Sequence, residues 1–153
     1  MLDLIKKIDK RINILREILE NYLLPVYQLT IRIYLSGIFF SSGLGRLDSY
    51  LNGNWSDQLF LFQYEHPVPY LSPSIAASIT TLAELILPIL LLSGFLGRVG
   101  AVGILIMSIV IELTYMHSDQ HVLWISMSLL IVITGAGKIS LDHLINGIIN
   151  KKQ

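Results

Sequence analysis

Residues 74–96 read SIAASITTLAELILPILLLSGFL, and Glu84 is their single charged residue. A helix of about 20 residues crosses a hydrocarbon core of ~30 Å, and this stretch has that length and an apolar composition. Three other apolar runs cover residues 23–44, 98–117 and 122–137. We therefore predict an all-α membrane protein, built as a bundle of four transmembrane helices.

The composition of the chain supports this class and excludes others. Its 153 residues are 53% hydrophobic and 14% charged, whereas a soluble domain is roughly 45–50% apolar and about 25% charged. The net charge is zero, and without a basic face we expect no nucleic-acid partner. Because the chain has no cysteine, it holds no thiolate-bound metal or cluster, and electron transfer would require a bound small molecule or a partner protein.

The distribution of basic residues predicts the orientation in the membrane. Arg46 lies in the connection after the first run, and Arg32 lies within that run. The other nine of the eleven Lys and Arg residues share the opposite side: Lys6, Lys7, Lys10, Arg11, Arg16, Arg98, Lys138, Lys151 and Lys152. By the positive-inside rule both termini lie in the cytoplasm, and an even number of spans agrees with this because it places both termini on one side.

Two segments outside the runs have an amphipathic pattern. Residues 1–22 are predicted to form an interfacial helix on the inner leaflet, a plain solvated helix being the alternative. Its apolar stripe comprises Leu4, Ile5, Ile8, Ile12, Leu15 and Leu19. The bundle domain covers residues 23–144, and residues 145–153 form a short cytoplasmic tail. Ser140 is placed to cap a short amphipathic helix that follows the fourth run.

The connection between the first two runs, residues 46–73, is long and rich in aromatic residues. It carries Tyr50, Trp55, Phe60, Phe62, Tyr64 and Tyr70. A loop of this length is usually functional or disordered, and the aromatic content argues against disorder. We predict an outer loop that folds back over the mouth of the bundle.

Three ionisable residues fall inside the predicted spans, namely Arg32, Glu84 and Glu112. Each costs about 2.5–3.5 kcal/mol at the bilayer centre on insertion scales. Arg32 and Glu84 differ in depth by only about 6 Å along their helices. One interpretation is a buried ion pair that sets helix register. The other is a polar pocket for a ligand headgroup or a proton path, lined by Arg32, Arg46, Glu84, Glu112, His117 and His121.

His117 and His121 are four residues apart, a spacing that suits one metal ion on a continuous helix. The chain is expected to break between the third and fourth runs, which favours ordinary interfacial histidines. No metal is therefore predicted. Gly97, Gly100 and Gly103 are expected to let the third helix pack closely against a neighbour.

The order of these features resembles the DoxX family of small bacterial membrane proteins. The resemblance rests on RIYLSGIFFSSGLGRL at 32–47, Glu84, GFLGR at 94–98 and GAGKISLD at 135–142. It runs from residue 32 to about residue 144. Arg46 stands where the family more often has lysine, and Ala136 stands where proline is common.

The resemblance implies a multi-pass protein of the bacterial inner membrane. Some members are described as the membrane subunit of a thiosulfate:quinone oxidoreductase, and others as partners of sulfur-handling or oxidative-stress enzymes. Carried over, a quinone cofactor would contact Arg32, Arg46 and Glu84, and a redox protein would supply electrons. Arg98, Ser140 and Asp142 would have structural roles.

Two other functions stay open from the sequence. The chain could be a non-catalytic scaffold or chaperone that holds a partner at the bilayer. A small transporter ranks third, because neither an inverted repeat nor an interrupted helix is visible. Glycines on the first and third spans are compatible with a homodimer.

Overall fold

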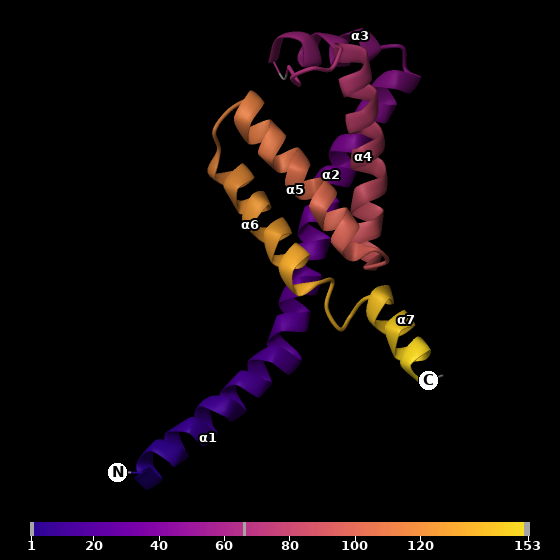
Figure 1. Ribbon diagram of the computed structural model, residues 1–153. Helices are drawn as coiled ribbons and strands as arrows, with labels where there is room; N and C mark the ends of the chain where they lie inside the picture. Colours follow the sequence, from indigo (N-terminus) through magenta and orange to yellow (C-terminus); the bar gives the residue numbers. More distant parts are fainter. Residues whose placement is uncertain (1, 66, 152–153) are drawn as a thin grey trace.

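A computed structural model describes residues 2–65 and 67–151 (Figure 1). All regular structure in these residues is helical, which confirms the predicted all-α class. The elements are α1 (Leu2–Ile18), a π-helical turn η1 (Leu19–Leu23), α2 (Leu24–Leu51), α3 (Trp55–Phe60), a second π-helical turn η2 (Leu61–Glu65), α4 (Pro73–Ser93), α5 (Gly97–Thr114), α6 (Asp119–Thr134) and α7 (Leu141–Asn150).

Three helical stretches in the described part of the chain are long and apolar enough to cross a membrane. They are Lys6–Leu51, Pro73–Ser93 and Gly97–Thr114. The fourth predicted span corresponds to α6, which is apolar but has only 16 residues. The integral membrane character thus rests on three helices, and the fourth crossing stays a prediction.

The distribution of side chains is inverted relative to that of a soluble protein. Large apolar residues such as Ile33, Ile86 and Ile106 are exposed on the outside of the helices. The buried polar residues are Gln28, Arg32, Ser36, Thr81, Glu84, Ser108, His121, Ser128 and Ser140. An apolar exterior suits lipid, and polar side chains in the interior find hydrogen-bond partners there that lipid does not offer. Each of the four helices α2, α4, α5 and α6 contributes at least one of these buried polar residues.

The helices pack in sequence order, α2 on α4, α4 on α5 and α5 on α6. Gly100 lies so close to α4 that a Cβ atom there would be 2.8 Å from the backbone nitrogen of Leu91. Gly103 and Gly97 likewise lie against Leu87 and Ala136. The predicted close packing through these three glycines is confirmed. Below, the end of the bundle that carries α3 is called the α3 end, and the opposite one the α7 end (Figure 1).

The predicted loop over residues 46–73 is wrong for most of its length. The helix α2 continues to Leu51 and ends at the Asn52-Gly53 turn. Gly53 has φ +78°, a left-handed conformation that cannot continue an α-helix. Two helical turns, α3 and η2, follow it. Phe62 from η2 is buried against Ala76 and Ala77 of α4, so this segment packs on the bundle.

The N-terminal segment is continuous with the first span. Helical turns run without interruption from Leu2 to Leu51, and only the wider turn η1 separates α1 from α2. Figure 1 shows α1 projecting from the bundle as a straight arm. The apolar stripe residues Ile8, Ile12, Leu15 and Leu19 are exposed, and their placement in a membrane interface stays a prediction. Residues 145–150 of the predicted tail belong to α7, whereas Lys152 and Gln153 lie outside the described residues.

Candidate functional site

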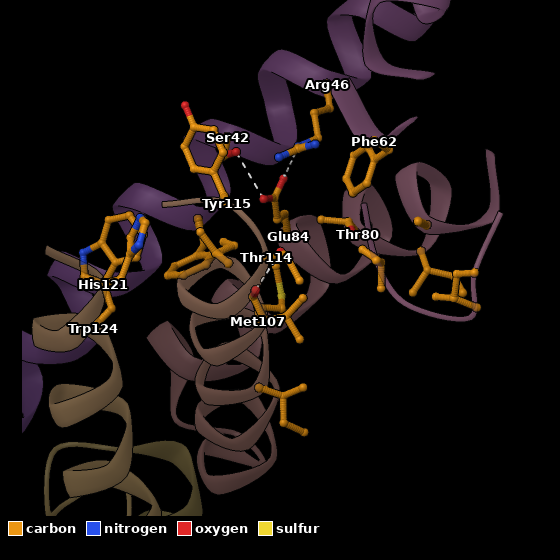
Figure 2. A pocket seen from close by; sticks show the side chains of 18 of the residues that line it. Ser42, Arg46, Phe62, Thr80, Glu84, Met107, Thr114, Tyr115, His121 and Trp124 are labelled. Atoms are coloured by element: carbon orange, nitrogen blue, oxygen red, sulfur yellow. Dashed lines mark hydrogen bonds and ion pairs between the residues drawn. The ribbon is translucent and has the colours of Figure 1, made fainter. Parts of the chain in front are cut away.

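A cavity of about 360 Å³ lies at the α3 end, between α2, α4, α5 and α6, with Phe62 of η2 at its edge (Figure 2). Most of its lining is apolar. The lining side chains that carry hydrogen-bonding groups are Ser42, Arg46, Thr80, Glu84, Thr114, Tyr115, His121 and Trp124. Exposed Ile79 and Ile106 are also part of its wall, so the cavity reaches the apolar exterior of the bundle.

An ion pair between Arg46 and Glu84 forms the charged part of this cavity. Arg46 Nε donates to Glu84 Oε2 at 2.9 Å, and Ser42 Oγ donates to Glu84 Oε1 at 3.2 Å. The Glu84 side chain is 2% exposed and that of Arg46 is 18% exposed. The Arg46 guanidinium also lies 5.0 Å from the centre of the Phe62 ring, within the range of a cation–π contact. A buried carboxylate thus has both oxygens satisfied.

The local sequence explains why these groups meet. Ser42 and Arg46 are four residues apart on α2 and therefore lie on the same helix face. Gly43 between them allows α4 to approach, since a Cβ atom there would be 2.9 Å from the Cβ of Glu84. One turn beyond Glu84, Pro88 accepts a hydrogen bond through its carbonyl from Ser36 Oγ at 2.9 Å. The close crossing of α2 and α4 brings the charged pair together.

Two nitrogen donors among the lining residues have no partner in the described part of the chain. Arg46 Nη1 and Trp124 Nε1 are both buried, and neither makes a hydrogen bond there. The Trp124 ring is held by Phe39 at 5.3 Å and by His121 at 5.1 Å between ring centres. Buried donors nearly always have a partner. These two groups therefore indicate a site for a ligand that accepts hydrogen bonds.

A second carboxylate, Glu112, connects this cavity to the surface of the protein. Its Oε1 lies 2.8 Å from Nδ1 of His117, and its Oε2 lies 3.0 Å from Nδ1 of His121. Oε2 also accepts from the backbone N–H of Ser118 at 3.1 Å. The His117 side chain is 87% exposed, whereas that of His121 is 10% exposed and lines the cavity. As predicted, the chain breaks between the third and fourth helices: α5 ends at Thr114, His117 lies in the connection, and α6 starts at Asp119.

Arg32 lies apart from this cavity, and the expected contact with Glu84 is not formed. Its Nε donates to the carbonyl of Leu91 at 2.8 Å, and Nη2 donates to that of Leu92. Its Nη1 donates to the carbonyls of Ala136 and Ile139 at 3.0 and 2.6 Å. The carbonyls at a helix C-terminus lack helical partners and carry partial negative charge. The buried cation therefore binds the end of α4 and the 135–140 loop.

Asp142 fastens the same end of the bundle. Its carboxylate accepts from the backbone N–H groups of Leu96 and Gly97 at 2.9 and 3.0 Å. Its own N–H donates to the carbonyl of Gly94 at 3.0 Å. Ser140 caps α7 by accepting from the N–H of His143 at 3.2 Å. The stretches 94–98 and 135–142 thus meet around Arg32.

The predicted pocket residues consequently fall into two places. Arg46, Glu84 and His121 line the cavity, and Glu112 and His117 extend from it. Arg32 belongs to the α7 end. Ser42 and Trp124 were missed as cavity residues. The spacing of Ser42 to Arg46 and of His121 to Trp124, one helical turn in each case, could have indicated them.

Comparison with known protein families identifies the family of the chain. A family model described as DoxX matches residues 27–117, more than half of the chain. The matched segment includes Ser42, Arg46, Glu84 and Glu112. No curated protein and no solved structure matches the chain.

Proposed function

The chain belongs to the DoxX family, and we propose that it serves as the membrane subunit of a quinone-linked redox system. Its apolar helices make it an integral membrane protein. The observation that carries the proposal is the buried Nη1 of Arg46 beside Glu84, which has no hydrogen-bond partner among the described residues and lies in a cavity with mostly apolar walls. A redox partner protein would have to supply the electrons, because the chain has no cysteine.

The residues of the cavity fit the chemistry of a quinone headgroup. A quinone is a flat apolar ring whose two carbonyl oxygens accept hydrogen bonds, and it supplies reversible electron and proton uptake when bound. Arg46 and Trp124 would donate to these oxygens, and Phe39 and Phe62 would provide aromatic surface beside the ring. The volume of about 360 Å³ lies in the range of small-molecule sites. The exposed Ile79 and Ile106 would let the ligand enter from lipid.

The Glu112 cluster would connect such a ligand to protons at the surface. An ionised Glu112 accepts from the Nδ1–H of both histidines, a tautomer assigned from the hydrogen-bond network. The Nε2 atom is then the acceptor that His121 offers to the cavity. His121 would take a proton from the ligand at Nε2 and release its Nδ1 proton to Oε2 of Glu112, which leaves a neutral imidazole and a neutral carboxylic acid. This transfer uses side chains alone and requires no water in the cavity, and the exposed His117 holds the other oxygen of Glu112 at the surface.

Replacing Arg46 tests the quinone proposal. We expect Arg46→Gln to weaken binding of a short-chain quinone by at least about tenfold, because a charged hydrogen bond contributes about 1.5–3 kcal/mol. Binding is measured on the purified protein by quenching of tryptophan fluorescence. The control Arg11→Gln removes an exposed arginine of α1 and should leave the affinity unchanged.

Since Arg46→Gln leaves Glu84 buried without its cation, the double variant Arg46→Gln/Glu84→Gln separates folding from binding. It restores neutrality and should unfold close to the wild-type temperature, yet still bind the quinone weakly. Absence of quinone binding by the wild-type protein, or equal affinities of the Arg46 and Arg11 variants, would refute the proposal.

Replacing Glu112 tests the histidine cluster without any ligand. The amide of Glu112→Gln has one acceptor oxygen and one NH₂ donor, so it cannot accept from two Nδ1–H groups as the carboxylate does. We expect at least one of His117 and His121 to change tautomer. Nitrogen NMR of labelled histidine in nanodiscs reports this, with His143 on α7 as the internal control. Unchanged spectra of both rings would contradict the proposed coupling.

We further propose four crossings, with α6 as the fourth and both termini in the cytoplasm of a bacterium. A 16-residue α6 spans only about 24 Å, and local thinning of the bilayer accommodates such a helix. The basic residues gather at the α7 end and on α1, as the positive-inside rule requires of the cytoplasmic side.

Cysteine labelling tests this topology, and the chain contributes no background because it lacks cysteine. Asn54→Cys at the α3 end should react with a membrane-impermeant maleimide in intact cells. Lys151→Cys at the α7 end should react only after the cells are broken. Both positions are exposed. Equal labelling of Lys151→Cys before and after lysis would exclude the proposed orientation.

A further inference from the structure

A second cavity, of about 510 Å³, lies at the α7 end, where α2 and α5 begin and the 135–140 loop crosses. Arg98, Lys138 and His143 are among the residues that line it. We propose that this cavity binds a phosphate group, and specifically the headgroup phosphate of an anionic phospholipid. The proposal is independent of the quinone site, because the two cavities share no lining residue.

The floor of this cavity is fixed by buried polar contacts. Gln28 Nε2 donates to Thr134 Oγ1 at 2.9 Å and to the carbonyl of Gly135 at 3.2 Å. Gly135 and Gly137 both have φ +86°, a backbone that favours glycine, and Gly137 lies directly against Gln28. The loop is thus held in one conformation by a side chain of α2. A preorganised floor lowers the entropic cost of binding a ligand on it.

The acidic residues of the cavity are already engaged. Asp142 accepts from the N–H groups of Leu96 and Gly97, and Glu20 accepts from Arg16 Nε at 2.7 Å. Neither carboxylate forms an ion pair with Arg98 or Lys138 in the described part of the chain.

The two cations retain free donors. Arg98 makes no hydrogen bond or ion pair within the described residues, and its guanidinium lies along Gly135, where a Cβ atom would be 3.5 Å from Nε and Nη2. Lys138 Nζ donates to Asn21 Oδ1 at 2.8 Å, which leaves two of its three N–H bonds. Phosphate oxygens suit this combination, because the arginine fork binds them in pairs and lysine adds a point charge.

The surroundings favour a lipid as the source of this phosphate. Leu24 of α2 lines the cavity, and Leu23 next to it is exposed, so this side offers an apolar surface to acyl chains. Free phosphate has the same charge chemistry but would leave these residues uncovered. Basic pockets next to membrane-spanning helices bind anionic headgroups in general.

Native mass spectrometry of the detergent-purified full-length protein tests the proposal. Phosphatidylglycerol is the probe, diacylglycerol serves as the lipid without phosphate, and inorganic phosphate serves as the competitor. We expect phosphatidylglycerol adducts and no diacylglycerol adducts. Arg98→Gln/Lys138→Gln should weaken phosphatidylglycerol binding by about tenfold. The control Lys6→Gln/Lys151→Gln removes two exposed charges outside the cavity and should have little effect.

The remaining outcomes each decide the question. Equal losses in the two double variants would show that general surface charge attracts the lipid, and would overturn the proposal. Displacement of the lipid by inorganic phosphate at equal concentration would assign the site to free phosphate and overturn the lipid source. If the double variant does not fold by circular dichroism, Lys138→Gln alone is measured, since its side chain contacts only Asn21 among the described residues. A loss of at least about threefold then supports the site, and no loss overturns it.

Discussion

Arg32→Met is expected to lower the free energy of unfolding by about 3–5 kcal/mol, the range seen when one partner of a buried charged interaction is removed. Arg32 is 1% exposed, and its guanidinium donates to four carbonyls, those of Leu91, Leu92, Ala136 and Ile139. Methionine fills much of the volume but donates nothing. The carbonyls of Leu92, Ala136 and Ile139 then lose this donor, whereas that of Leu91 keeps the N–H of Gly94, and each buried unsatisfied carbonyl costs about 1–3 kcal/mol.

Reversible unfolding by SDS in mixed micelles, followed by circular dichroism, measures this loss. Arg16→Met is the matched control, because Arg16 lies on the same continuous helix but is exposed and binds only Glu20. An exposed pair of this kind contributes at most about 1 kcal/mol. If Arg32→Met were no more destabilising than Arg16→Met, the Arg32 contacts would not hold the α7 end together.

Gly100→Leu is expected to be the most disruptive packing change. Even a methyl group at this position would meet the backbone of α4, at 2.8 Å from Leu91 N and 2.9 Å from the carbonyl oxygen of Leu87. Backbone atoms cannot rotate away as a side chain does, so α4 and α5 must separate. Overpacking of a buried site costs typically about 1–3 kcal/mol, and occasionally more. We expect at least 3 kcal/mol here, in line with this upper range.

The same SDS titration reports the effect, and Gly37→Leu serves as its control. Gly37 also lies in a membrane-spanning helix, but a Cβ atom there would meet nothing within 4 Å. Leucine at position 37 should be neutral or slightly stabilising, because glycine is the poorer helix former by about 0.8–1.0 kcal/mol relative to alanine. Similar losses for both variants would mean that helix contact at Gly100 is not close.

The bundle itself could be predicted from the sequence, because its determinants are local. Apolar runs follow from the lipid environment, and the inward position of Ser36, Glu84 and Ser108 follows from helical spacing. Gly97, Gly100 and Gly103 indicate close packing because they recur every three residues and therefore lie near one face of the helix. Each of these inferences needs only the spacing of residue types along one helix.

The partners of the buried charges could not be predicted in the same way. The comparison of depths placed Arg32 near Glu84 because a difference of about 6 Å is within the reach of an arginine side chain, but depth does not fix the direction in which that side chain extends. Its actual acceptors are main-chain carbonyls, which no residue type marks in a sequence. Arg46 was placed in a loop, although residues 46–51 contain no helix breaker, and only the extension of α2 carries it to Glu84.

The aromatic residue Trp124 illustrates a third limit. A tryptophan near the end of a span is typical of an interfacial anchor, yet Trp124 packs on Phe39 and His121 and lines the cavity. Amphipathic side chains suit both environments equally. Only the arrangement of the neighbouring helices distinguishes the two.

The unbroken helix from Leu2 to Leu51 contains both the projecting α1 and one wall of the cavity. At about 1.5 Å per residue it is roughly 75 Å long, and Ser42 and Arg46 lie near its far end. Any tilt or twist of α1 must either be transmitted along this helix to the ion pair with Glu84 or be absorbed at η1, where the helix is wider. The five residues Leu19–Leu23 are therefore the joint at which mechanical coupling between the two ends is set.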